Sequence, residues 1–378
     1  MKRTGILAAL LLLLVCGCGA QTTQETSQIE WSQLEQMDTL PLDYAKQFSV
    51  QYYTDDYALI TVAEQQKYLL VPEGKPVPSG LDADVTVLQQ PLDTIYLVST
   101  SAMDYFRELD AIDTISLSGT QEKDWYIQEA KQAMENGSMT YAGKYSAPDY
   151  ELITATGCDL AIENTMIYHT PKVKEQLESM GTPVFVDYSS YEAHPLGRME
   201  WLKLYGVLLN KREQAEQAYD ELLQKLEPML EEPKTDKTVA FFYITSNGAV
   251  SVRKSGDYVA KAIELAGGNY VFSDLEDDTA TASMNMQMER FYSQAKDADI
   301  LIYNSTIEGE LTQMSQLLEK SAMLADFKAV QNGNVWCTEK NLFQESLGLG
   351  DLMVDLHAVI TNQQISDDDL TYLHRLKQ

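Results

Sequence analysis

Three side chains in one short segment have chemistry suited to holding a small anionic molecule. Tyr191, His194 and Arg198 lie within eight residues of one another. An arginine can clamp a carboxylate or a catecholate oxygen through two parallel hydrogen bonds. Tyrosine and histidine can stack on a ligand or bind iron directly. His194 precedes Pro195, so it could equally cap the start of a helix, and Arg198 in that helix could serve a structural salt bridge.

Signatures of catalysis are absent from the sequence. It contains no G-x-S-x-G elbow, no H-E-x-x-H, no P-loop and no Rossmann glycine pattern, so we expect no enzyme and no cofactor. An extracellular hydrolase is the least favoured hypothesis. A zinc- or manganese-binding lipoprotein needs several converging histidines, and the chain has only four, so we expect no bound metal ion. A sensor or scaffold that has lost its cleft is a further alternative.

The N-terminus has the order of a secretory signal. Lys2 and Arg3 precede an apolar run at residues 6–15 that is too short to span a bilayer, and Gly17 precedes Cys18. This order predicts a signal peptide over residues 1–17. It also resembles a lipobox, in which the cysteine carries acyl chains, so Cys18 is the expected lipidation site. Residues 18–30 are polar and predict a flexible, lipidated tether. We expect the folded body on the outer face of the cytoplasmic membrane, although a plain cleaved signal is an alternative.

Charge restricts the class of partner. The chain has 28 Lys+Arg against 57 Asp+Glu, a formal net charge of -29 over 378 residues. Such acidity argues against binding of nucleic acid and against wide contact with anionic lipid. No second long apolar segment is present, so we expect membrane contact only through the lipid anchor. Cys158 and Cys337 are the two cysteines of the body, and their spacing leaves open whether they pair.

Strand and helix patterns alternate along the body and predict an α/β fold of two lobes. Residues 48–62 suggest a hairpin, and the short apolar segments 94–98 and 158–162 suggest buried strands. The alternation stops at a long charged helix without glycine, residues 211–230, and then resumes. We therefore expect an N-terminal lobe over residues 31–210, a connecting helix over 211–232 and a C-terminal lobe over 233–378. A single connecting helix is stiff, so we expect a ligand cleft between lobes that move little.

The two halves of the chain repeat one pattern. Glu151 and Glu289 each begin a short helix, and each is followed eight to ten residues later by an aspartate and an apolar strand. The helix dipole favours a glutamate in a first turn, which would explain one of them alone. The resemblance below rests on this repeat and on five further segments, which are residues 145–162, 180–186, 211–230, 289–303 and 327–336.

In the order and spacing of these segments the chain resembles the substrate-binding lipoproteins of iron–siderophore, haem and cobalamin ABC importers. The resemblance implies a monomer that captures an iron complex, of the siderophore type in the first place, and delivers it to a membrane permease. Haem or cobalamin in the same role is the alternative. By position, Glu151 and Glu289 match the glutamates that dock such proteins on their permease subunits.

The resemblance also places ligand contacts in loops at strand ends that face the cleft. The candidates in such loops, besides Tyr191, His194 and Arg198, are Trp125, Tyr145, Asn164, Arg253, Tyr303 and Trp336. Trp336 could instead belong to the core, and Arg253 could face either an anionic ligand or solvent.

Overall fold

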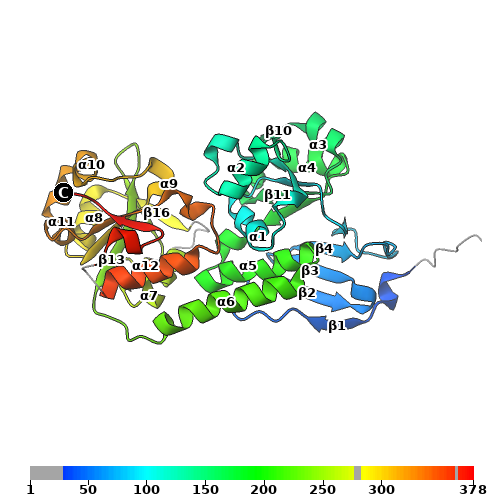
Figure 1. The fold of residues 1–378 in the computed structure, drawn as a ribbon, viewed down its shortest axis with the longest axis horizontal. Helices are drawn as coiled ribbons and strands as arrows, with labels where there is room; N and C mark the ends of the chain where they lie inside the picture. Colours follow the sequence, from blue (N-terminus) through cyan, green and yellow to red (C-terminus); the bar gives the residue numbers. More distant parts are fainter. Residues whose placement is uncertain (1–28, 276–281, 362–364) are drawn as a thin grey trace, which may run out of the picture.

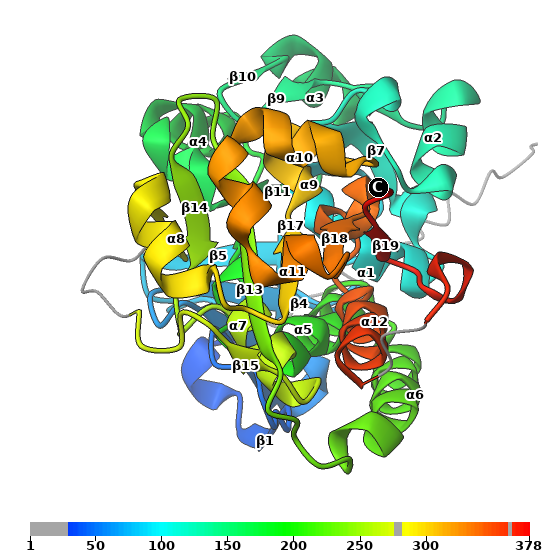
Figure 2. The same ribbon diagram turned by 90° about the vertical axis from the view of Figure 1, so that its left-hand side faces the viewer.

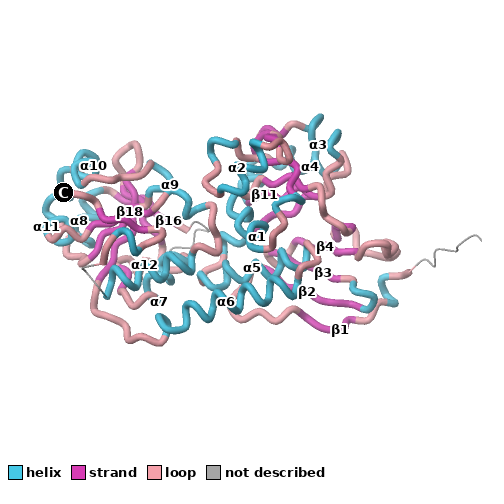
Figure 3. Tube along the Cα trace, viewed as in Figure 1, coloured by secondary structure: helices cyan, strands magenta, loops and turns pink. Residues whose placement is uncertain are grey.

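The computed structural model describes residues 29–275, 282–361 and 365–378 (Figure 1). The predicted signal peptide, Cys18 and nearly all of the predicted tether lie outside these residues. Within them, no helix has both the length and the apolar character needed to cross a bilayer. The described chain forms an α/β fold with three larger sheets and a small two-stranded sheet of β9 (Gly143–Lys144) and β10 (Ala147–Pro148). Figure 3 shows the strands in magenta among the helices. Cys158 and Cys337 are buried and free, so they do not pair.

The first of the larger sheets has five strands and is here called the N-terminal sheet. Its strands lie in the order of the sequence, and the pairs are antiparallel except for the last. Ala58, Ile60 and Val62 alternate inward along the third strand, as expected of a sheet with one buried face. The predicted hairpin at 48–62 is confirmed as the second and third strands. The five strands are β1 (Gln36–Thr39), β2 (Phe48–Tyr53), β3 (Ala58–Val62), β4 (Gln66–Val71) and β5 (Val85–Gln89).

The N lobe is built on a parallel sheet with the order β12-β11-β6-β7-β8. Its central strands are apolar and buried, which is typical of parallel sheets covered on both faces. The strands are β6 (Ile95–Leu97), β7 (Ile115–Ser118), β8 (Thr140–Tyr141), β11 (Leu160–Asn164) and β12 (Val184–Asp187). The helices are α1 (Met103–Glu108), α2 (Gln128–Glu135), α3 (Tyr150–Thr156) and α4 (Pro171–Ser179).

The C lobe carries a mixed sheet with the order β16-β14-β13-β17-β18-β19, and β15 pairs with β13. The strands are β13 (Thr238–Ile244), β14 (Val250–Arg253), β15 (Asn269–Tyr270), β16 (Ser283–Met286), β17 (Ile300–Tyr303), β18 (Val335–Thr338) and β19 (Leu373–Arg375). The helices are α7 (Tyr258–Leu265), α8 (Met288–Ala295), α9 (Ser305–Glu308), α10 (Met314–Lys320), α11 (Lys328–Gln331) and α12 (Leu349–Thr361).

Helix α6 (Arg212–Leu230) connects the lobes along the base of the molecule, within the range predicted for it (Figure 1). Helix α5 (Pro195–Leu208) is buried along its whole length and packs against α6. The approach is close, since a Cβ added at Gly206 would lie 2.4 Å from the Cβ of Ala215. Helix α12 packs on α5, α6 and α7, as Figure 2 shows from the side of the C lobe. The connection is therefore one continuous helix supported by two neighbours.

A short segment of the C lobe, residues 343–347, makes a second connection to the N lobe. The Gln344 side chain accepts the N–H of Tyr126 over 2.8 Å and donates to the carbonyl of Asp124 over 2.8 Å. Ser346 donates to the carbonyl of Ser101 over 3.0 Å. Because Gln344 and Ser346 are both nearly inaccessible to solvent, these bonds are sheltered from competing water. We call residues 343–347 the interlobe strap.

Candidate functional site

The C-lobe side of the site is a small hollow of about 100 Å³, lined by the middle of β13, the end of β14 and the residues that follow β17. Arg253 lines it together with Asn304 and Ile307. The Arg253 guanidinium lies 3.5 Å from Asp257, and a quarter of its side chain is exposed. Burial alone lowers the pKa of Arg253, but Asp257 and nearby tyrosines outweigh it and the pKa is raised. Arg253 is therefore a charged side chain that an anionic ligand can reach.

The N-lobe side is a row of aromatic side chains, here called the tyrosine row. It consists of Tyr168, which follows β11, and Tyr188 and Tyr191, which follow β12. The ring centroids of Tyr168 and Tyr188 are 6.3 Å apart, and those of Tyr188 and Tyr191 are 5.4 Å apart. Tyr168 is 44% exposed and Tyr191 is 47% exposed, beside the equally exposed Met166. Large exposed rings at the ends of parallel strands offer a flat surface for ligand contact.

Sequence reasoning named Tyr191 as a ligand candidate and pointed to the loops that contain Tyr188 and Met166, but it did not single out Tyr168. The signal was available, because these residues come directly after the segments predicted as strands, where the carboxyl ends of parallel strands collect binding groups. In the structure, the aromatic residues of two neighbouring loops form the surface.

Arg198 lies in α5 between the lobes, and its guanidinium already contacts residues of the C lobe. Its guanidinium lies 4.7 Å from the centroid of the Tyr258 ring in the C lobe, and it donates to Ser346 of the strap over 3.4 Å. The side chain is buried, and its Nε has no hydrogen-bond partner among the described residues. Arg198 and Arg253 are close enough for their charges to oppose each other, and Asp257 acts on both. The structure thus brings the two predicted arginines together, with Arg253 as the accessible one.

Two of the predicted ligand residues have capping roles. His194 accepts the N–H of Leu196 at the start of α5 over 3.2 Å, and its ring stacks on Tyr44 at 4.7 Å. Burial lowers the pKa of His194, which favours the neutral ring. Asn164 accepts the N–H of Met166 over 2.9 Å and so caps the turn after β11. For His194 the capping alternative considered from the sequence is the one that the structure shows.

Three predicted ligand residues are corrected to core residues, because they are inaccessible to solvent. Trp125 donates its indole N–H to Ser118, and Trp336 donates to Asn334 while Arg375 covers its ring. Tyr303 is fully buried in β17. Tyr145 is half-buried and packs against the outer hydrophobic cluster of the N lobe. Large aromatic residues at predicted strand ends fill cores as readily as they line clefts.

Comparison with known proteins agrees with this architecture. The family model described as periplasmic binding protein matches residues 97–342. The chain belongs to the periplasmic binding protein family. The resemblance inferred from the sequence is thereby confirmed. The N-terminal sheet precedes the matched residues.

Two curated relatives of this periplasmic binding protein are similar over nearly the full length. Both are uncharacterized lipoproteins of Methanocaldococcus jannaschii. The first is 25% identical in an alignment that spans 94% of this chain and 91% of the relative. The second is 23% identical in an alignment that spans the whole of both chains.

Solved structures of similar fold include a periplasmic heme binding protein of Pseudomonas aeruginosa, with 17% identity, a TM-score of 0.58 and coverage of 76% of this chain and 99% of that one. The heme binding protein HutB of Vibrio cholerae has 16% identity and a TM-score of 0.57, and covers 69% of this chain and 98% of its own. An Fe3+-hydroxamate transport protein of Saccharomonospora viridis has 19% identity and a TM-score of 0.57, and covers 72% of this chain and 94% of its own. These likenesses concern the fold.

The two glutamates predicted to dock this periplasmic binding protein on a permease occupy equivalent places. Glu151 lies in the first turn of α3 and Glu289 in the first turn of α8, and both are exposed. Each helix packs on the sheet of its own lobe, so one carboxylate lies on each lobe. Their docking role stays a prediction.

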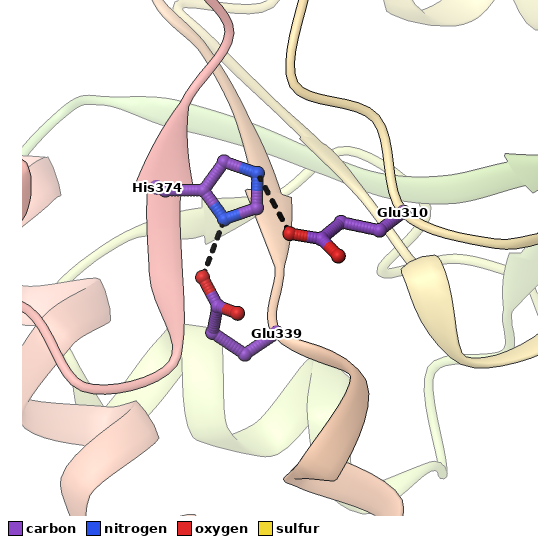
Figure 4. Close-up of side chains that lie close together, drawn as sticks. All are labelled: Glu310, Glu339 and His374. Atoms are coloured by element: carbon purple, nitrogen blue, oxygen red, sulfur yellow. Dashed lines mark hydrogen bonds and ion pairs between the residues drawn. The ribbon is translucent and has the colours of Figure 1, made fainter.

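One group of three side chains in the described residues has the composition of a metal site (Figure 4). His374 lies 2.6 Å from Glu339 through Nδ1 and 2.8 Å from the carbonyl of Leu311 through Nε2, with Glu310 at 3.9 Å. Hydrogen bonds to Cys337 and Glu339 raise the pKa of His374 to about 11. Both ring nitrogens therefore carry protons directed at oxygen atoms. This geometry is an ion pair that fastens β19, since a metal ion needs a free nitrogen lone pair.

Proposed function

We propose that this chain is the lipid-anchored substrate-binding protein of an ABC importer. It captures an anionic iron complex, such as a siderophore chelate, between its lobes and delivers it to a membrane permease. The family membership supports the transport role. Two observations support the choice of ligand: the exposed aromatic rings of the tyrosine row in the N lobe, and the charged, partly exposed Arg253 in the C lobe.

The chemistry of the two surfaces is complementary to such a ligand. Flat tyrosine rings pack on the organic part of a chelate, and a guanidinium binds the oxygen atoms of a carboxylate or catecholate in bidentate fashion. Haem and cobalamin also carry flat rings and acidic or amide groups, so both belong in the same test. The named relatives that bind heme or a ferric hydroxamate support the inclusion of all of these ligands.

Native mass spectrometry of the purified protein tests the proposal. The panel consists of a ferric catecholate, a ferric hydroxamate, haem and cobalamin, each offered at the same concentration. We expect one stoichiometric complex with an iron chelate. Binding of haem or cobalamin alone would change the ligand class while keeping the transport role, and binding of none of the panel would contradict the proposal.

A further inference from the structure

A second cavity, of about 820 Å³, lies apart from the site between the lobes. It opens between the N-terminal sheet and the turn that joins α5 to α6. Its volume is within the range of pockets that hold small organic molecules, roughly 300 to 1,000 Å³. Its lining shares no residue with the hollow at Arg253, so the two cavities are separate.

The inner wall of this cavity is apolar and contains one unsatisfied polar atom. Ala58, Leu70 and Leu92 line it and are buried. Tyr52 also lines it, and its buried hydroxyl has no hydrogen-bond partner among the described residues. Burial raises the pKa of Tyr52 to about 12, so the hydroxyl stays neutral.

The charged side chains around the opening are mostly acidic, and its two basic side chains, Arg212 and Lys211, already bind other groups of the protein. Arg212 lies over the Tyr52 ring at 4.5 Å and pairs with Glu216 at 2.7 Å. Lys211 donates to the carbonyls of Leu109 and Asp110 over 2.6 and 2.9 Å.

Most acidic side chains of the lining form no ion pair within the described residues. Asp55 pairs with Lys75. The other carboxylates of the lining make no ion pair within the described part of the chain, and they are Asp38, Asp56, Glu73 and Asp93. An apolar interior under a rim with surplus negative charge complements a molecule with an apolar body and a positive head.

We propose that this cavity binds a small amphipathic organic cation, of the alkylammonium class. The alkyl part lies against Leu70 and Leu92, and the ammonium group lies at the rim near Asp38 and Asp56. The site is independent of the ligand between the lobes, and it gives the N-terminal sheet a binding role of its own.

A matched series of three probes tests the proposal by isothermal titration calorimetry on the full chain. n-Hexylammonium, 1-hexanol and hexanoate share one alkyl chain and differ in charge. We expect n-hexylammonium to bind at one site at least about tenfold more tightly than hexanoate and clearly more tightly than 1-hexanol. Equal binding of 1-hexanol and n-hexylammonium would mean an apolar hollow without cation selectivity, and absence of saturable binding up to about 10 mM would overturn the site.

Substitutions of lining residues test where in the cavity the probe binds. Asp38→Asn and Asp56→Asn should each lower the affinity for n-hexylammonium by about threefold, as expected of partly exposed charges. Asparagine tolerates the left-handed backbone of Asp56, at φ 66°, so the fold is kept. Asp82→Asn, an exposed change outside the cavity, is the control. Undiminished binding in the double variant of Asp38 and Asp56 would contradict the assignment.

Discussion

Gln344 of the C lobe accepts the backbone N–H of Tyr126 in the N lobe over 2.8 Å, although 217 residues of chain separate them. Together with α6, this contact fastens the lobes at two places that are far apart in sequence. A protein held in this way resists opening, because both a helix and a buried hydrogen-bonded strap must be disturbed.

Gln344→Ala should therefore loosen the lobes. The change leaves the N–H of Tyr126 and the carbonyl of Asp124 without their partner, and we expect a loss of about 2 kcal/mol in the free energy of unfolding. Small-angle scattering should show an unchanged radius of gyration on ligand binding for the natural protein and a decrease for the variant. Gln331→Ala, an exposed glutamine of the same lobe, is the control. A large decrease for the natural protein would show that the lobes hinge freely.

The docking glutamates should affect transport but leave ligand binding unchanged. Glu151→Ala and Glu289→Ala remove exposed carboxylates on helices of different lobes, and exposed ion pairs are individually weak, so we expect the double variant to show the larger loss of uptake. Uptake of labelled ligand and the dissociation constant are measured in parallel, with Glu175→Ala and Glu319→Ala as matched exposed changes. A tenfold loss of ligand affinity, about 1.4 kcal/mol, would place the glutamate in the binding site instead.

Glu163 should make stability depend on pH. It is fully buried in β11, neither carboxylate oxygen has a hydrogen-bond partner among the described residues, and burial raises its pKa from 4.5 to about 8. The unfolded carboxyl releases its proton above pH 4.5 while the folded one keeps it, so stability falls as the pH rises from about 4.5 to about 8.

The neutral variant Glu163→Gln should lack this decline. Relative to the natural protein, it should gain stability on the order of 4 kcal/mol between pH 4.5 and pH 9. Chemical denaturation at several pH values measures the difference, with the exposed Glu175→Gln as the control. Parallel pH profiles for the natural protein and Glu163→Gln would show that the carboxyl finds a partner in solution.

Cys18→Ser should prevent lipid anchoring. Because two acyl chains on Cys18 are expected to hold the protein at the membrane, the serine variant should leave the membrane fraction or remain an unprocessed precursor. Labelling with a radioactive fatty acid and fractionation measure both outcomes, and Cys16→Ser is the matched control. Label in the Cys18→Ser protein would mean that acylation occurs elsewhere.

Local patterns predicted the elements of this fold better than its long-range contacts. The glycine-free helix α6 and the hairpin β2–β3 follow from composition and alternation alone. The burial of α5 does not, because its Glu200 carboxylate is satisfied by the backbone N–H groups of Tyr44 and Ala45, more than 150 residues away. The strap at Gln344 depends in the same way on partners that no local pattern reveals.

The candidate site was predictable in outline only. Position after a strand selects candidate loops, but whether a side chain lies in the core or on the surface depends on which way it points. Trp125 and Trp336 point inward and fill cores, while Tyr168 and Tyr188, in neighbouring loops, form the surface that the polar residues were expected to form. Arg253 lines a hollow and pairs with Asp257, and its role in ligand binding stays a prediction.

Fluorescence titration of the protein with a ferric catecholate tests the ligand site most directly. Tyrosine and tryptophan emission should be quenched on binding, and Arg253→Gln should weaken binding at least about tenfold, because the variant loses a charge-assisted contact to the anionic ligand. Arg290→Gln, an exposed arginine in α8 of the same lobe, should bind like the natural protein. Equal affinity of the natural protein and Arg253→Gln would contradict binding between the tyrosine row and Arg253.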